Sequence, residues 1–102
     1  MFEINKWKWG VYFVDPKHPM LLRDDGSFSI GACDSITQKI YINDTLNSDL
    51  FKRVLCHEIV HAAMFSNNVI LDIDEEEVIA NIIAKYGEEI IKITNSLFTK
   101  LK

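Results

Sequence analysis

The segment at residues 50–65, LFKRVLCHEIVHAAMF, constrains the fold of this chain more than any other part. It contains no glycine or proline, and its apolar residues recur at the spacing of an α-helix. Ser48 and Asp49 precede it and offer an N-cap and an acidic first turn, whereas SNN at 66–68 ends the pattern. We therefore predict one long helix here, and its apolar composition predicts that much of it is buried.

The chain before this helix is predicted to form strands. WKWGVYFVD at 7–15 is rich in aromatic and β-branched residues, and two prolines follow it. A turn signal, DDGS at 24–27, leads into SFSIGAC at 27–33, which predicts a short second strand. Trp7 and Trp9 are two residues apart, so we expect them to share one face of the first strand, either in the core or in a patch at the sheet edge.

A third strand is predicted at residues 36–43, ITQKIYIN, where side chains on one face are mostly apolar. That face carries Ile36, Gln38, Ile40 and Ile42. We therefore predict an α+β fold, in which a small antiparallel sheet of about three strands is followed by two or three helices.

We expect one domain over residues 1–102, with the sheet in residues 1–45 and the helices in residues 46–102. A second helix is predicted to begin at EEEVIANIIAKY, with Asp74 as its cap. Gly87 is either a break between two helices or a weak point within one. An apolar stripe at alternating steps of four and three residues is predicted to face the core. Its members are Ile79, Ile83, Tyr86, Ile90, Ile93 and Leu97.

His57 and His61 are four residues apart in the first helix, so their side chains lie one turn above each other. Two imidazoles at this spacing can bind one ion at Zn–N distances of about 2.0–2.1 Å. The neighbouring apolar side chains predict a buried environment, in which unpaired polar groups are costly. A metal ion, Zn²⁺ above all, would supply the missing partner for both rings.

Glu58 follows the first of these histidines and is rotated about 100° from it around the helix axis. It would therefore flank the ion rather than bind it. A carboxylate in that position can accept a proton from a metal-bound water, as in the H-E-x-x-H pattern. We predict Glu58 as a general base.

A catalytic zinc site usually has a third protein ligand. His18 lies beside Pro19 in a turn and is expected to be a loop residue instead. The acidic run at 72–77 is a better source, because a second helix packing antiparallel on the first would bring Glu77 level with the histidines. Glu76 stays open as the alternative third ligand. Asn81, on the same face as Glu77, is predicted to accept a hydrogen bond from a ligand imidazole.

These residues resemble a gluzincin, the class of zinc peptidases with two histidines from H-E-x-x-H and a downstream glutamate. More closely, GACDSITQKIYIN, LCHEIVHA and EVIANIIA resemble ImmA/IrrE-like metallopeptidases and phage-type minimal zincins. The resemblance covers about half of the chain. It implies zinc ligands at His57, His61 and Glu77, and a catalytic base at Glu58. It also implies a minimal zincin-like fold with an edge strand beside the active-site helix.

We therefore expect zinc-dependent hydrolysis of a peptide or protein, with the peptide paired to an edge strand at 38–43. Members of the family that it resembles can cleave repressor-type proteins, so a repressor-type regulator is one candidate substrate, although the resemblance does not imply it for this chain. A catalytically weak or inactive zinc-stabilised protein-binding module is the alternative. A third hypothesis is a helical interaction protein without metal, in which residues 79–97 bind a partner helix.

The composition narrows the choice of partners and compartment. The net charge of −4 and the absence of a basic stripe argue against nucleic-acid binding. No apolar run is long enough for a membrane span, and the start, MFEINKWKWG, does not have the pattern of a signal peptide. Cys33 and Cys56 are expected to be reduced, buried thiols. We expect a cytoplasmic protein with no nucleic-acid or membrane partner.

Overall fold

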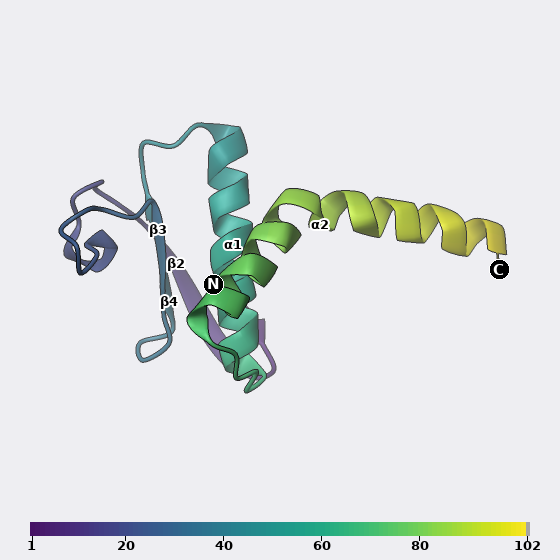
Figure 1. The fold of residues 1–102 in the computed structure, drawn as a ribbon, viewed down its shortest axis with the longest axis horizontal. Helices are drawn as coiled ribbons and strands as arrows, with labels where there is room; N and C mark the ends of the chain where they lie inside the picture. Colours follow the sequence, from purple (N-terminus) through teal and green to yellow (C-terminus); the bar gives the residue numbers. More distant parts are fainter. Residues whose placement is uncertain (102) are drawn as a thin grey trace.

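The computed structural model describes residues 1–101 and contains a small sheet and two long helices (Figure 1). The strands are β1 (Phe2–Ile4), β2 (Trp7–Val14), β3 (Gly31–Asp34) and β4 (Lys39–Asn43). The helices are α1 (Ser48–Ser66), α2 (Ile73–Leu101) and the short 3-10 helix η1 (Pro19–Leu21). Strands come first and helices second, so the predicted α+β class is confirmed.

The sheet differs from the prediction in strand number and direction. Its order is β1-β2-β4-β3, and β2 pairs with β4 in parallel while the other two pairs are antiparallel. β1 is an additional short strand, joined to β2 by a turn in which Asn5 and Lys6 have positive φ. The connection from β2 to β3, which contains η1, leaves one strand position empty between them. β4 fills this position, so it lies between β2 and β3. The prediction of an edge strand at 38–43 is therefore wrong, because β4 is central and β3 is the edge.

The apolar alternation of the third predicted strand holds only for its second half. Ile40 and Ile42 of β4 are fully buried, whereas Ile36 is 91% exposed. Gln38 has φ of +56°, which belongs to the turn between β3 and β4 rather than to a strand. The turn ends at Gln38, and Ile36 therefore lies outside the sheet.

The core lies between the sheet and α1. Its fully or nearly fully buried members are Trp9, Ile40, Ile42, Val54 and Ala62, and Trp7 packs against them. Trp9 also donates a hydrogen bond from Nε1 to Ser66 Oγ at 2.9 Å, which joins β2 to the last turn of α1. This bond satisfies the buried indole N–H, as core packing of a tryptophan requires.

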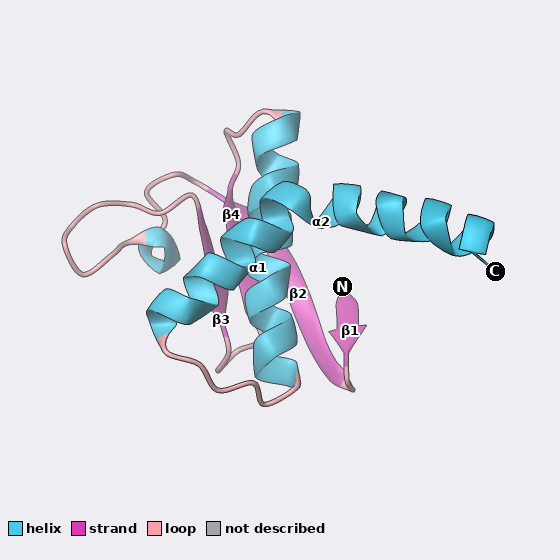
Figure 2. Ribbon diagram, turned by 45° about the vertical axis from the view of Figure 1, so that its right-hand side comes forward, coloured by secondary structure: helices cyan, strands magenta, loops and turns pink. Residues whose placement is uncertain are grey.

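The first helix has almost the predicted limits. Asn47, one residue before Ser48, is the N-cap, and its side chain accepts a hydrogen bond from the Leu50 N–H at 2.9 Å. The helix ends at Ser66, and the Asn67 N–H donates to carbonyls of the last turn. Figure 2 shows α1 lying along one face of the sheet, which fixes the direction in which its polar side chains point.

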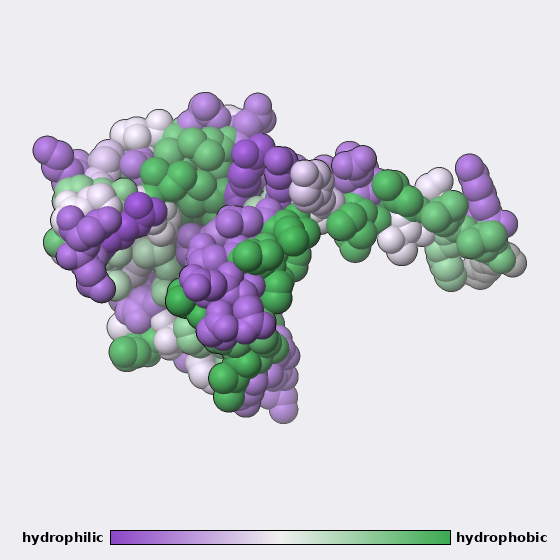
Figure 3. All heavy atoms as spheres, viewed as in Figure 1, coloured by the Kyte–Doolittle hydropathy of each residue, from purple (hydrophilic) through white to green (hydrophobic). Residues whose placement is uncertain are grey.

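The second helix departs from the prediction at its start, and of the two alternatives at Gly87 the structure has the continuous helix. Asp72, not Asp74, caps it by accepting a hydrogen bond from the Glu75 N–H at 2.9 Å. The helix continues through Gly87 to Leu101 as one element. Its first half packs on α1, and its second half extends away from the sheet and α1 as an arm (Figures 1 and 3).

The apolar stripe of α2 does not face the core as predicted. Among the described residues of α2, only Ala80 is buried. The stripe residues are 36–52% exposed. The radius of gyration is 15.1 Å, and the longest extent is 51 Å. A compact chain of this length would have a radius of gyration of about 13 Å, so the arm makes the molecule extended. Within residues 1–101, no helix combines the length and apolarity that a membrane span requires.

Candidate metal centre

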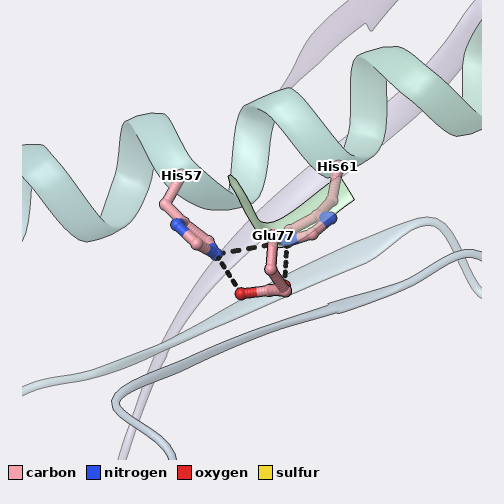
Figure 4. Close-up of side chains that lie close together, drawn as sticks. All are labelled: His57, His61 and Glu77. Atoms are coloured by element: carbon pink, nitrogen blue, oxygen red, sulfur yellow. Dashed lines mark hydrogen bonds and ion pairs between the residues drawn. The ribbon is translucent and has the colours of Figure 1, made fainter. Parts of the chain in front are cut away.

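His57 and His61 project from adjacent turns of α1 toward Glu77 of α2 (Figure 4). Their Nε2 atoms are 3.2 Å apart. Glu77 Oε1 lies 2.8 Å from His61 Nε2, and Glu77 Oε2 lies 3.2 Å from His57 Nε2. The antiparallel return of α2 over α1 therefore brings together the three residues that were predicted as ligands.

The spacing of these atoms fits one tetrahedral zinc ion. Two ligand atoms about 2.05 Å from a common ion, at the tetrahedral angle, are about 3.3 Å apart. The observed Nε2–Nε2 distance of 3.2 Å is close to that value. Two imidazole nitrogens and a carboxylate are also a donor set that zinc enzymes use, with the fourth position open to water. The residues present therefore fit a catalytic zinc ion.

Glu76 contacts the other ring nitrogen of His61, Nδ1. Its Oε1 lies 2.6 Å from Nδ1 of His61, and its side chain is only 14% exposed. An ionised carboxylate can only accept, so this contact favours the His61 tautomer that donates from Nδ1–H, and in that tautomer the Nε2 lone pair can bind a metal. Glu76 is thus a positioning residue in this geometry, and Glu77 is the carboxylate that meets both Nε2 atoms.

The role predicted for Asn81 belongs to Glu76 instead. Asn81 lines the same cleft. In the part of the chain that the structure describes, it makes no hydrogen bond to either histidine.

Glu58 lies beside the histidines but outside the metal-ligating group. It is 7% exposed, on the side of α1 that faces β3. Burial raises the pKa of Glu58 to about 7, because the ionised form loses its hydration; the charge of His61 opposes this shift and that of Glu77 adds to it. A carboxyl group whose pKa lies near neutrality suits proton transfer in both directions.

Gly31 is a residue of this site that the sequence reasoning passed over. A Cβ at Gly31 would lie 2.6 Å from Val54 Cγ1 and 3.0 Å from Glu58 Oε2. Only glycine therefore lets β3 approach α1 this closely. A glycine at the start of a short strand is a known signal for close backbone approach, and it was available in SFSIGAC.

A cleft of about 660 Å³ opens over the site. Strand β3 forms one wall, and α1 and α2 form the others. The Cys33 thiol faces this cleft, and burial together with the nearby charges of Glu58, Asp34 and Glu76 raises its pKa to about 12. The thiol is therefore protonated at neutral pH. Arg23 and Arg53 are the cationic side chains that line the cleft.

His18 lies outside the site, as predicted. Its Nδ1 accepts a hydrogen bond from the Met20 N–H at 3.0 Å, and its ring stacks on Tyr41. Both cysteines are free thiols.

Comparisons with protein-family models, curated proteins and solved structures found no match to this chain.

Proposed function

We propose that this chain is a zinc-dependent peptidase of the gluzincin type. The observation that carries the proposal is the convergence of His57 Nε2, His61 Nε2 and a Glu77 oxygen within 4.8 Å of one another. Glu58, held next to this cluster and not part of it, adds the group that a purely structural zinc site does not need.

A zinc ion bound there would polarise the scissile carbonyl and lower the pKa of a bound water toward 7. Glu58 accepts the proton of the attacking water and later delivers it to the leaving amine. Its buried position disfavours the charged state and raises the pKa of Glu58 to about 7, which makes the carboxylate a stronger base toward the water. Glu76 holds the His61 ring in one tautomer throughout the reaction.

The edge strand β3 gives the substrate a place to bind. Asn43 N–H donates to the Ile30 carbonyl, so in the antiparallel ladder Gly31 and Cys33 turn their backbone groups away from β4. The Ser29 hydroxyl hydrogen-bonds to both backbone groups of Gly31. Its Oγ accepts from the Gly31 N–H at 3.3 Å and donates to the Gly31 carbonyl at 2.6 Å. An extended peptide would add to this edge by β-augmentation and displace the Ser29 hydroxyl.

The substrate in this proposal is a peptide or a protein segment, with repressor-type regulators among the candidates. The cleft has a volume of about 660 Å³, and residues of β3 line one side of it. The two free thiols fit a reducing compartment such as the cytoplasm.

The substitution Glu58→Gln tests the assignment. We expect the variant to bind zinc as tightly as the natural chain and to lose peptide hydrolysis by about 10²-fold or more. Hydrolysis of a fluorogenic peptide library, with zinc affinity measured in parallel, is the readout. His57→Ala is the matched control and should lose both zinc binding and hydrolysis. Undiminished hydrolysis by Glu58→Gln would refute the role of Glu58.

A zinc-stabilised binding module is the second candidate. Within residues 1–101, the cleft is lined by no tyrosine and by no histidine besides His57 and His61. Many zinc peptidases use such a side chain to stabilise the oxyanion. If the module hypothesis is right, the natural chain and Glu58→Gln will bind zinc equally, and neither will hydrolyse any peptide.

A further inference from the structure

The arm of α2 carries an exposed apolar stripe. Six large side chains along it are 36–52% exposed: Ile79, Ile83, Tyr86, Ile90, Ile93 and Leu97. Figure 3 shows the apolar surface continuing along the arm. Over 18 residues at 1.5 Å each, the stripe is about 27 Å long. Monomeric proteins rarely leave a continuous apolar surface of this length in water.

The stripe is accessible along the arm because α1 packs on the opposite face of α2. Contacts to α1 come from Glu77, from buried Ala80 and from Glu88, whose Oε2 pairs with Lys52 Nζ at 2.8 Å. At 100° per residue, Glu77 and Glu88 lie on the side of the helix away from the stripe, whereas Glu76, which contacts His61, lies beside Ile83. A second helix can therefore bind the stripe along the arm, and it approaches α1 only at the first turns of α2.

We propose that a second copy of this chain binds the stripe, with the two α2 helices antiparallel. The steps of four and three residues are those of a heptad repeat. An antiparallel two-fold arrangement centred beside Glu88 pairs Tyr86 with Ile90 of the second copy. The same register pairs Ile83 with Ile93 and Ile79 with Leu97, so every stripe residue meets an apolar partner.

Charge selects the antiparallel arrangement over the parallel one. The first turn of α2 carries Asp74, Glu75 and Glu76, and its last turn carries Lys100. Antiparallel copies place each acidic first turn near the other copy's Lys100. Parallel copies would place the acidic turns together and Lys100 beside Lys100, which is unfavourable.

Charge also disfavours a membrane surface as the occupant. The polar side of the arm has Lys85 and Lys92 together with Glu88 and Glu89. Amphipathic helices that bind anionic membranes have an excess of basic residues on this side. The balanced charges here suit an exposed face of a helix pair.

Sedimentation equilibrium on the full chain tests the proposal. We expect a particle of twice the 11.8 kDa chain mass at tens of micromolar. Ile90→Glu should weaken the association by at least about tenfold. Asn95→Glu, on the polar side of the same arm, is the matched control and should remain a dimer. Far-UV circular dichroism checks that both variants keep their helices.

Cysteine cross-linking tests the orientation. An Ile83→Cys, Ile93→Cys double variant should form a covalent dimer on oxidation, whereas Ile90→Cys alone should not, because Tyr86 faces it. The natural chain, oxidised in the same way, shows the background from Cys33 and Cys56. A monomeric natural chain, a dimer unaffected by Ile90→Glu, or cross-linking of the Ile90→Cys variant would overturn the proposal. So would a natural chain that binds phosphatidylserine vesicles through the stripe as a monomer.

Discussion

At the scale of single residues, Glu76 and Glu77 are neighbours in the sequence but serve different nitrogens of His61. Glu76 accepts from Nδ1–H at 2.6 Å, and Glu77 lies 2.8 Å from Nε2. Successive helical residues point about 100° apart, so the buried imidazole can lie between the two carboxylates. One carboxylate can therefore orient the ring while the other meets the metal.

Glu76→Gln tests this division of roles. The amide keeps an oxygen that can accept from Nδ1–H but removes the charge that strengthens the bond. We expect zinc affinity to fall by about 10- to 100-fold. Calorimetric titration gives the affinity, and Glu75→Gln is the matched control because Glu75 is exposed and adjacent. Equal affinities of the Glu76→Gln and Glu75→Gln variants would show that Glu76 has no part in the site.

At the scale of elements, the site depends on how closely β3 approaches α1. Gly31 sets that distance, since any larger residue would contact Val54 and Glu58. Because β3 packs this closely on α1, its residues Gly31–Cys33 line the same cleft as His57 and His61. The packing of a strand on a helix thus determines where a substrate backbone can lie.

Gly31→Ala should therefore harm both stability and activity. The added Cβ would lie 2.6 Å from Val54 Cγ1, and overpacking of this kind costs about 1–3 kcal/mol. Urea unfolding measures the change in the free energy of unfolding. Gly87→Ala is the control, because its Cβ meets only the half-exposed Ile83 side chain at 3.3 Å. If Gly31→Ala unfolds at the same urea concentration as the natural chain, the close approach has no structural importance.

Local patterns in the sequence predicted the parts of the fold that depend on neighbouring residues. The four-residue spacing placed His57 and His61 on one face of α1, and the antiparallel return of α2 placed Glu77 near them. The parallel pairing of β2 with β4 could not be predicted, because it depends on where a crossover of more than 15 residues returns. The exposure of the apolar stripe could not be predicted either, because a helix face buried in the core and an exposed interface have the same periodicity.

At the scale of the whole molecule, the candidate metal centre joins two parts that share few other buried contacts. Its three candidate ligands come from α1 and from the first half of α2, whereas the main core lies between α1 and the sheet. The smaller apolar cluster between the two helices contains Val60, Met64 and Ala80. A zinc ion would add binding free energy at this junction and hold α2 in the position that closes the cleft.

The most direct measurement is calorimetric titration of zinc into chelator-treated protein. We expect one zinc ion per chain for the natural protein and for Glu58→Gln, and no measurable binding for His61→Ala. A natural chain that binds no zinc, or a His61→Ala variant with the stoichiometry and affinity of the natural chain, would contradict a metal centre at these residues.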